Sequence, residues 1–278
     1  MKQYTRQELR ARIQAVIDAG RPVIQATGGT GISGKFAERG GADMIAIPAS
    51  GFFRMDGKGS TAALMPYGNA NDIMLQMANR ILPVLKEVPV IACICGSDPT
   101  RLMKPFLRQL QDMGFSAVKN YPTVGGIEGM HRAHLEQNDF GVKKELETLA
   151  LARDMGFFTL GYSYDEETAE QVAKLDLDIL NTHSGLTTGG DVGSKFNEKK
   201  SLQDVADFIN RLHNAAKKYN PNIWVMAHGG PIKEPADTEF IYRHTKAIGF
   251  TGASSMERLP IEKPLQKIVE DFKNVKMR

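Results

Sequence analysis

The stretch "ATGGTGISGKFAERGGADMIAIPAS", residues 26–50, joins the end of one apolar run to a second run through a glycine-rich turn and a short helical segment. Short apolar runs that lack polar alternation are typical of parallel strands buried on both faces. Parallel neighbours need a crossover connection, and the segment between these two runs is long enough for a helix. The stretch therefore predicts a strand–helix–strand unit, and the rest of the chain repeats this pattern.

The same stretch matches the G-x-x-x-x-G-K spacing of a nucleotide-binding phosphate loop over Gly29 to Lys35. Such a loop needs Ser or Thr after its lysine to bind Mg²⁺, and Phe36 stands there. We therefore expect neither a nucleotide nor an organic cofactor. Two interpretations stay open: the glycines permit a tight strand-to-helix turn, or backbone N–H groups near Gly31 bind a substrate anion.

Eight apolar runs occur in the chain, at residues 22–27, 43–49, 88–95, 116–121, 157–163, 177–183, 222–228 and 249–255. Amphipathic helical segments lie between them. This repetition favours an α/β fold of the (β/α)₈ TIM-barrel type, with an extra N-terminal helix and long loops over the C-terminal face. An open doubly wound sheet is the alternative. No linker or low-complexity segment interrupts the pattern, so we expect a single domain over residues 1–278.

Composition and charge restrict the class of protein. The 42% hydrophobic and 24% charged residues fit a globular chain, and a net charge of +3 without a basic block does not predict nucleic-acid binding. The charged amphipathic segment at residues 1–20 does not resemble a signal peptide, and no apolar run reaches the ~18–20 residues that span a bilayer. Cys93 and Cys95 lie two apart on one strand, a poor geometry for a disulfide or a metal pair. We expect a reducing, cytoplasmic location.

Loop lengths indicate where a site would lie. Three connections that leave strands are long, at residues 50–69, 122–138 and 184–200, whereas the connections that enter strands are short. In a barrel the long ones all project from the carboxyl-terminal face, where active sites are found. We therefore predict a covered mouth, with the loops after strands 2 and 6 excluding water.

Strands 7 and 8 end in "HGGPI" (228–232) and "GASSMERLP" (252–260), a position where barrels often bind phosphate. Gly229, Gly230, Ser254 and Ser255 are small, and the serines add hydroxyl donors. We interpret these four residues as an anion cradle. The alternative is tight turns with capping serines.

Three titratable residues are candidates for proton transfer. His183 and His228 end strands 6 and 7, and an imidazole titrates near neutrality. Glu257 follows strand 8 and is a candidate general acid or base. The alternative is that the histidines are hydrogen-bonded structural groups and that Glu257 belongs to a surface ion pair.

Further polar residues are candidates for substrate binding. Arg54 and Arg258 are suited to hold a carboxylate by bidentate contact. Ser50 begins the loop after strand 2, and Asn120 ends strand 4, where we expect its amide to face inward. The spacing of Cys and His residues announces no metal, but carboxylates scattered over strand ends would leave no pattern. Mg²⁺ or Mn²⁺ therefore stays open.

Seven stretches in one order carry a resemblance to a known family, at residues 29–38, 50–60, 65–72, 120–129, 183–193, 228–235 and 252–260. They resemble the phosphoenolpyruvate hydrolase-like TIM-barrel proteins nearly end to end. The resemblance implies a place among phosphoenolpyruvate- and pyruvate-binding barrels, whose enzymes make or break C–C, C–P or C–O bonds through enolate-like species. It also implies kinship with the barrel part of a plant tobamovirus-resistance protein, where a protein-binding role is known.

This chain departs from the family pattern in two places. Relatives typically have Tyr-Asn-Ser-Gly before the lid, whereas this chain has Pro-Ala-Ser-Gly at 48–51. Pyruvate-type barrels usually hold Mg²⁺ on carboxylates near the ends of strands 3 and 4, where this chain offers Cys95, Asp98 and Asn120. The second departure puts the usual Mg²⁺ site in doubt.

The residues and the resemblance together predict a barrel enzyme that acts on a small anionic metabolite, phosphorylated or carboxylated, by lyase or hydrolase chemistry. The alternative is a non-catalytic barrel that senses a ligand or binds another protein. Barrels of this kind often associate, so a homo-oligomer is also open.

Overall fold

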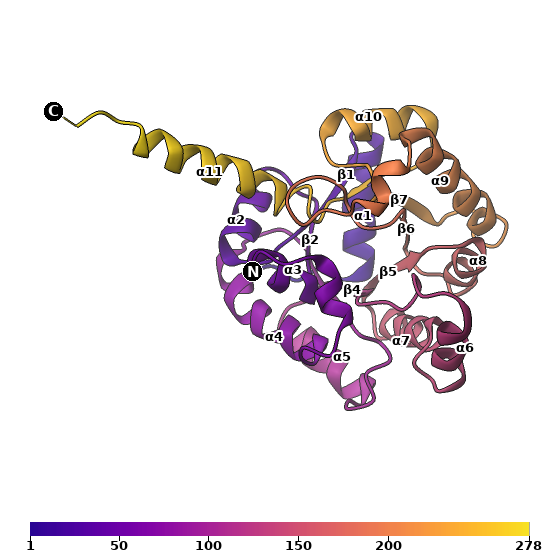
Figure 1. The fold of residues 1–278 in the computed structure, drawn as a ribbon. Helices are drawn as coiled ribbons and strands as arrows, with labels where there is room; N and C mark the ends of the chain where they lie inside the picture. Colours follow the sequence, from indigo (N-terminus) through magenta and orange to yellow (C-terminus); the bar gives the residue numbers. More distant parts are fainter. Residues whose placement is uncertain (278) are drawn as a thin grey trace.

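A computed structural model describes residues 1–277 and shows a closed barrel of eight parallel strands, β1 to β8, in sequence order (Figure 1). The barrel closes where β1 pairs with β8, with Gln25 opposite Thr251. The predicted (β/α)₈ architecture is therefore confirmed, and the open sheet is excluded. The strands are Val23–Thr27, Met44–Ile47, Val90–Ile94, Ala117–Asn120, Phe158–Ser163, Ile179–His183, Trp224–His228 and Gly249–Thr251.

Helices cover the outside of the barrel, and most follow a strand directly. The α-helices α1 to α11 are Arg6–Asp18, Gly31–Arg39, Ala49–Met55, Ala70–Ile81, Met103–Asp112, Gly129–Gln137, Val142–Asp154, Glu166–Lys174, Leu202–Lys217, Pro235–His244 and Leu259–Lys273. The 3₁₀ helices η1 to η3 are Ser60–Leu64, Leu82–Val84 and Phe196–Lys199. Each of the three long loops predicted at the carboxyl-terminal face contains helical turns, in α3 and η1, in α6 and in η3.

Successive strand residues point alternately into the barrel and toward the helices, which produces two apolar clusters. On β4, Ala117 and Tyr121 belong to the inner cluster, whereas Val118 belongs to the cluster under the helices. Lys119 shares the inward parity and Asn120 the outward parity. The barrel interior therefore receives a lysine from a strand that is otherwise apolar.

The extra N-terminal helix predicted from the sequence is α1, and it closes the amino-terminal end of the barrel. Its Leu9 and Ile13 are buried in the inner cluster. On its polar side, Arg6 Nε lies 3.0 Å from the carboxylate of Asp178, and Arg10 contacts the same carboxylate. Asp178 precedes β6 and also accepts hydrogen bonds from the backbone and hydroxyl of Thr159 on β5, at 2.9 and 3.1 Å. The barrel consequently opens only at its other end.

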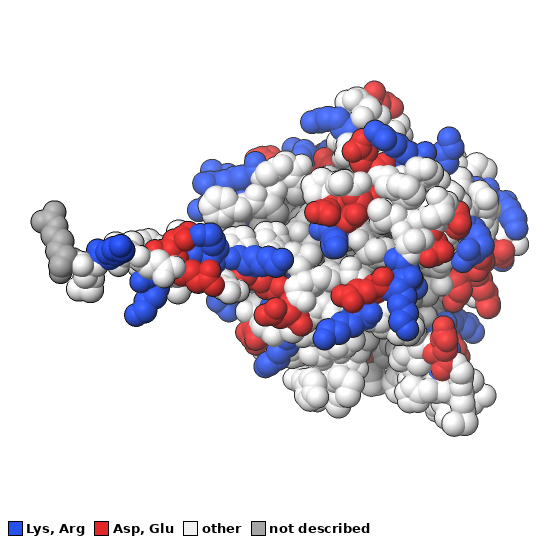
Figure 2. Space-filling model, turned by 45° about the horizontal axis from the view of Figure 1, so that its top comes forward, with Lys and Arg blue, Asp and Glu red and all other residues white. Residues whose placement is uncertain are grey.

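The last helix, α11, leaves the body of the molecule instead of packing against it (Figure 1). Figure 2 shows Lys and Arg side chains interspersed with Asp and Glu side chains along this helix and over the face of the barrel in view. Among the described residues, no helix combines the length and the apolar character needed to cross a bilayer.

The ion pairs beneath the barrel lead to a prediction about stability. Asp178→Asn removes a buried charge that two arginines share, so we expect the free energy of unfolding to fall by about 3 kcal/mol. Urea denaturation followed by circular dichroism measures this loss. Asp176→Asn is the matched control, because the Asp176 side chain is exposed, pairs with Arg6 at 3.4 Å and accepts a hydrogen bond from Asn220 at 3.1 Å. Its expected effect is within about 0.5 kcal/mol. Equal losses in the two variants would contradict the bridging role of Asp178.

Candidate functional site

A small cavity lies at the carboxyl-terminal end of the barrel, under the loops that follow β2 and β6. Its free volume is about 30 Å³, room for a water molecule or two rather than for a metabolite. Its lining residues are Gln25, Thr27, Ala46, Pro48, Ser50, Arg54, Ser60, Cys93, Tyr121, Tyr162, His183, Leu186, Thr187, His228, Ala253 and Ser254. Ser60 and Thr187 come from the two loops predicted to exclude water. The loops must therefore move apart to admit a ligand of metabolite size.

A buried ion pair forms one wall of this cavity. Arg54 of α3 donates from Nε to Glu257 Oε2 at 2.8 Å, and its Nη2 lies 2.7 Å from the same oxygen. Nη1 donates to Ser50 Oγ at 2.8 Å and to Ser60 Oγ at 3.1 Å. The ion pair lies next to Gly29, where an added Cβ atom would be 2.1 Å from Glu257 Oε1. Glycine at position 29 therefore leaves room for Glu257, which supports the interpretation that the glycines permit a tight turn.

Two histidines lie side by side on the neighbouring strands β6 and β7, with ring centroids 4.5 Å apart. His183 Nδ1 accepts a hydrogen bond from the backbone N–H of Gly185 at 3.1 Å, so the proton of the neutral ring is on Nε2. His228 Nδ1 lies 2.7 Å from the carbonyl oxygen of Thr251, which can only accept, so this ring carries its proton on Nδ1. The backbone thus fixes opposite tautomers: Nε2 of His183 is a donor, and Nε2 of His228 is an acceptor.

Both imidazoles are held in the neutral form. Burial lowers the pKa of His228 to about 3, and the nearby Lys119 acts in the same direction. Burial and the adjacent His228 lower the pKa of His183 well below its ordinary value. Tyr164 stacks on His183 with centroids 4.4 Å apart, which adds to the exclusion of water from this ring. A neutral imidazole that accepts a proton and one that donates a hydrogen bond therefore coexist at neutral pH.

Lys119 lies beneath the cavity, fully buried in the barrel interior. Its Nζ donates to Gln25 Oε1 at 3.0 Å and lies 4.0 Å from the ring centroid of Tyr162. Burial lowers the pKa of Lys119 to about 7. Because both Gln25 and Tyr162 also line the cavity, the charge of this amine is sensitive to what the cavity contains.

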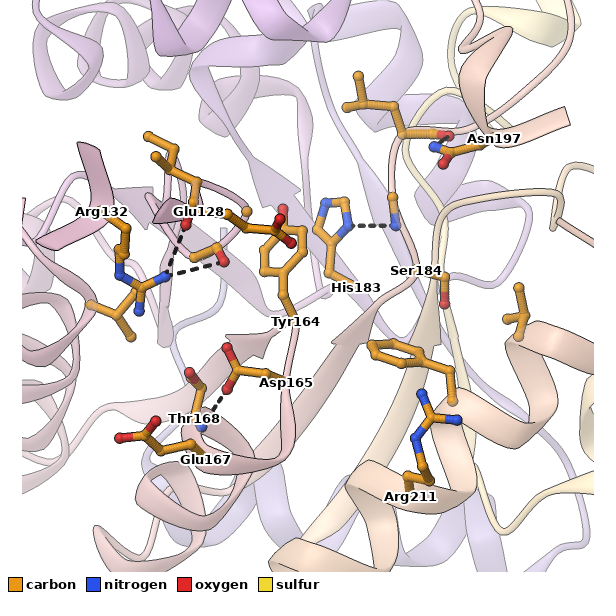
Figure 3. A pocket seen from close by; sticks show the side chains of 18 of the residues that line it. Glu128, Arg132, Tyr164, Asp165, Glu167, Thr168, His183, Ser184, Asn197 and Arg211 are labelled. Carbon is orange, nitrogen blue, oxygen red and sulfur yellow. Dashed lines mark hydrogen bonds between the residues drawn. The ribbon is translucent and has the colours of Figure 1, made fainter. Parts of the chain in front are cut away.

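A larger open groove adjoins the cavity and has a volume of about 1400 Å³ (Figure 3). It is formed by the segments that follow β4, β5 and β6, and its rim includes Glu128, Arg132, Asp165 and Arg211. His183 belongs to the lining of both the groove and the cavity. The groove therefore provides the approach to the cavity, and His183 stands at the boundary.

Five of the residues predicted from the sequence come together in the lining of the cavity. They are Ser50, Arg54, His183, His228 and Ser254. Glu257 belongs to the same cluster through its ion pair with Arg54. These residues come from β6, β7, the segment after β2 and the turn after β8, so only the closed barrel brings them together.

Gly229 and Gly230 support the loop after β6 rather than the cavity. Both have positive φ, +81° and +60°, and a Cβ on Gly229 would lie 2.0 Å from the carbonyl oxygen of Gly185. The N–H of Gly230 donates to that same oxygen at 2.8 Å. This donor is therefore engaged within the protein, and the predicted anion cradle keeps only Ser254 in the cavity lining.

Three other predicted residues face other parts of the molecule. Gly31 packs against α4, where its Cβ would lie 3.2 Å from the carbonyl oxygen of Arg80. Arg258 donates to the carbonyl oxygen of Gly189 at 2.9 Å and pairs with Glu262, so it fixes the loop after β6. Ser255 is outside the cavity lining, and its buried Oγ has no hydrogen-bond partner among residues 1–277. None of these three residues lines the cavity.

The inward orientation expected for Asn120 is corrected by the structure. Asn120 Nδ2 donates to Glu145 Oε2 on α7 at 2.8 Å, and Oδ1 accepts from the backbone N–H of Tyr162 at 2.8 Å. Burial raises the pKa of Glu145 to about 7, despite the hydrogen bonds that this carboxyl group accepts. The amide of Asn120 therefore faces the helix layer. Successive residues of a strand point to opposite faces, and on β4 the inward position belongs to Lys119.

The side chains near the ends of β3 and β4 do not fit a Mg²⁺ site. The Asp98 carboxylate accepts hydrogen bonds from Asn69, Asn71 and Thr100 and pairs with Arg101 at 3.1 Å. Burial alone would raise the pKa of Asp98, but these hydrogen bonds lower it to about 2. Within residues 1–277, no group of three or more His, Cys, Asp or Glu side chains is arranged to hold a metal.

Sequence reasoning missed Lys119 and its partners Gln25 and Tyr162. A signal existed, because "SAVKNY" (116–121) places one lysine in the middle of an otherwise buried strand. A charged residue at such a position is almost never buried without a partner or a function. The sequence places Ser50 and Ser60 in a polar loop, but it does not show that their hydroxyls accept hydrogen bonds from Arg54.

The chain matches the phosphoenolpyruvate hydrolase-like family model over residues 8–275. It belongs to this family. Among curated relatives, the ToMV resistance protein Tm-1(GCR237) of Solanum lycopersicum is 42% identical over 267 residues, which cover 96% of this chain and 35% of the relative. The chain thus spans about a third of the length of that relative. The resemblance seen in the sequence motifs is confirmed.

Solved structures with the same fold include two enzymes. Phosphoenolpyruvate phosphomutase from Streptomyces platensis subsp. rosaceus has a TM-score of 0.62 and 19% identity, over 95% of this chain and 87% of that chain. Phosphonopyruvate hydrolase in complex with oxalate and Mg²⁺ has a TM-score of 0.59 and 13% identity, over 95% and 87%. At these identities the similarity establishes the fold.

The neutral histidines lead to a prediction about pH. A histidine with a native pKa near 3 and an unfolded pKa near 6.5 binds a proton mainly when unfolded, so its contribution to stability is lost as pH falls from about 6.5 toward 3. Between pH 7 and pH 5 this amounts to about 2 kcal/mol for His228. His228→Asn keeps a donor for Thr251, and we expect the variant to lose about 2 kcal/mol less than the parent protein over this range.

Urea denaturation at the two pH values measures the difference, in which groups common to both proteins cancel. His213→Asn, on α9, is the control and should follow the parent protein. Identical pH dependence of the parent protein and His228→Asn would contradict a buried neutral His228.

Proposed function

We propose that this protein is a barrel enzyme of the phosphoenolpyruvate/pyruvate type, which binds a small carboxylated or phosphorylated anion and reacts through an enolate-like species, as a lyase or a hydrolase. The observation that carries the proposal is the pair of adjacent neutral histidines with opposite, backbone-fixed tautomers at the barrel mouth. Family membership supports this class of chemistry, as does the similar fold of phosphonopyruvate hydrolase, which has been solved in complex with oxalate and Mg²⁺.

The two histidines are suited to different roles. His228 Nε2 has a free lone pair, and a bound anion would raise the pKa of this ring from about 3 toward the range in which it serves as the base that removes or returns a proton next to a carbonyl. His183 Nε2–H donates a hydrogen bond to the oxygen on which enolate charge develops, as a neutral electrophile. Neither ring has to lose a proton first at neutral pH, and the basicity of His228 depends on the charge of the bound anion.

The anion itself is held by the cationic part of the cluster. The Arg54 guanidinium, whose N–H groups already donate to Glu257, Ser50 and Ser60, contributes its charge to the cavity wall, and Ser254 offers a hydroxyl in the same lining. Arg54 is charge-balanced by Glu257, so the incoming negative charge needs a further positive group. Lys119 supplies it, because an anion in the cavity favours the protonated form of the amine.

The cavity as it stands is too small for such a substrate, so opening of the loops after β2 and β6 is part of the cycle. Closure then excludes water from the reacting atoms. Arg258 joins the second loop to α11 through Gly189 and Glu262, which gives this loop a fixed point about which to move.

A non-catalytic barrel that senses a ligand or binds a protein is the competing proposal. The name of the related ToMV resistance protein supports it, since that name describes resistance to a virus rather than a reaction. The present chain covers 35% of that relative. The two proposals differ in whether His228 affects turnover.

Turnover is measured with phosphoenolpyruvate, phosphonopyruvate and oxaloacetate, with and without Mg²⁺ or Mn²⁺, by phosphorus NMR and by pyruvate release. We expect His228→Asn to lower kcat/KM by about 10²-fold or more, because it removes the general base. His213→Asn should retain full activity. Absence of turnover with every compound, together with unchanged ligand-induced melting shifts in His228→Asn, would favour the non-catalytic barrel.

Binding of the anion should be linked to proton uptake. Since the pKa of Lys119 is about 7 in the free protein and rises when an anion binds, we expect uptake of up to about one proton near pH 8. Affinity should accordingly fall as pH rises through 7 to 9. Isothermal titration of phosphoenolpyruvate in buffers of different ionisation enthalpy counts the protons.

Lys119→Met is the matched variant for this titration, because it keeps an unbranched side chain and removes the amine. It should abolish the proton uptake and weaken binding at pH 7. The same number of protons taken up by Lys119→Met would assign the linkage to another group.

A further inference from the structure

The side chain of Lys119 crosses the interior of the barrel. It leaves β4 at the position paired with Cys93 of β3, and its Nζ donates to Gln25 Oε1 on β1 at 3.0 Å. Because β1 and β4 are not neighbours in the barrel, the side chain has to span the inside of the barrel to reach this partner. Gln25, Cys93 and Tyr162, whose ring centroid is 4.0 Å from Nζ, all line the cavity. The amine therefore lies directly beneath side chains that face the cavity.

The surroundings of this amine suit a neutral nitrogen better than an ammonium group. Gln25 Oε1 is the hydrogen-bond acceptor of Lys119 Nζ, and none of the ion pairs formed within residues 1–277 includes Lys119. An ammonium group has three donors to satisfy, whereas a neutral amine donates to Gln25 and keeps a lone pair. Burial lowers the pKa of Lys119 to about 7, so a large share of the amine is neutral at neutral pH. Lys119 is therefore available as a nucleophile.

A second polar group in the barrel interior has no partner. Asn181 shares the inward parity of His183 on β6, and its Oδ1 accepts from Thr251 Oγ1 at 2.6 Å. Asn181 Nδ2 is buried without a hydrogen-bond partner among residues 1–277. Leaving a buried donor unsatisfied is unfavourable, and an oxygen atom of a ligand would satisfy it. The polar layer that contains Lys119 is therefore incomplete without a bound polar group.

A carbonyl substrate needs an electron sink before a proton can be removed from the carbon next to its carbonyl group. The Asp98 carboxylate, after β3, is engaged by Arg101 and Thr100 and is not free to hold a cation that would polarise the carbonyl. An iminium formed between a lysine amine and the carbonyl carbon provides such a sink. Among the residues in contact with the cavity lining, Lys119 is the amine that can form it.

We propose that Lys119 is a catalytic nucleophile that forms a Schiff base with the carbonyl carbon of a 2-oxo acid bound in the cavity. This inference rests on the proposed function, because it assigns the substrate class and the covalent step of the same site. The neutral Nζ bonds to the carbonyl carbon, the C=O π electrons move to oxygen, and a proton passes from nitrogen to that oxygen. The resulting carbinolamine takes one proton from solvent, releases its hydroxyl group as water and becomes the iminium.

The iminium fits the other roles assigned to the site. It keeps the single positive charge of a protonated lysine, so it still balances the carboxylate of the substrate. It also acidifies the C–H bond next to the iminium carbon, and His228 Nε2 removes that proton to give an enamine, the nitrogen counterpart of an enolate. The flexible stem of Lys119 allows Nζ to exchange its contact with Gln25 for the carbonyl carbon.

Trapping with borohydride tests the proposal. The protein is incubated with pyruvate or phosphonopyruvate, reduced with sodium borohydride, and analysed by intact mass spectrometry and peptide mapping. We expect one reduced adduct per chain, located at Lys119. Phosphoenolpyruvate and lactate, which have no ketone, should give no adduct. Adducts spread over exposed lysines, or none at Lys119, would overturn the proposal, and this mapping uses the parent protein alone.

Two methionine variants complete the trapping experiment. Lys119→Met should lose the adduct while circular dichroism shows a folded barrel. Lys217→Met is the matched control and should keep the adduct, because burial also lowers the pKa of Lys217, but this residue lies on α9 outside the cavity lining. An adduct of equal yield in Lys119→Met would assign the chemistry to another lysine and would overturn the proposal.

Trapping and turnover separate this inference from the proposed function. Turnover of phosphonopyruvate or oxaloacetate without an adduct at Lys119 would overturn the Schiff base and leave the proposed function standing. An adduct at Lys119 without turnover of any compound would support the Schiff base and count against the lyase or hydrolase activity.

Discussion

The buried ion pair between Arg54 and Glu257 is the constraint around which the mouth of the barrel is built. It connects α3, after β2, to the turn after β8, across the carboxyl end of β1. Ser50 and Ser60 accept hydrogen bonds from Arg54 Nη1, whereas Glu257 Oε1 is buried with no hydrogen-bond partner among residues 1–277, so the carboxylate depends on Arg54 for its stabilisation. The ion pair fits beside the glycine turn after β1 because residue 29 has no side chain, so packing, and not a bound phosphate, explains Gly29.

Much of the fold follows from the sequence because its signals are local. Eight apolar runs, the short connections into them and the long connections out of them identify the barrel and its open face. The ends of strands then bring His183, His228 and Ser254 together without further information. A single residue, Phe36, which is exposed on α2, is the reason why the first βα turn is not expected to bind a nucleotide.

The parts that could not be anticipated depend on parity and on partners distant in the chain. In a strand of four residues, a shift of one position exchanges the inward and outward sets, so Asn120 was expected where Lys119 lies. Gly229 and Gly230 suit an anion cradle by residue type, yet their conformation serves contacts with the loop after β6, some 40 residues earlier in the chain. Likewise, the sequence of α11 indicates an amphipathic helix, but it does not show the direction in which this helix leaves the barrel.

The closure of the barrel by α1 has a kinetic consequence for the amine in its interior. Leu9 and Ile13 seal one end, and the loops that follow β2 and β6 cover the other, so Lys119 has no direct contact with solvent. Lys119 would then exchange protons with solvent only when those loops open. After a sudden change of pH, Lys119 would keep its earlier charge until the loops next open. The protonation of this amine would therefore follow a change of pH slowly, at the rate of loop opening.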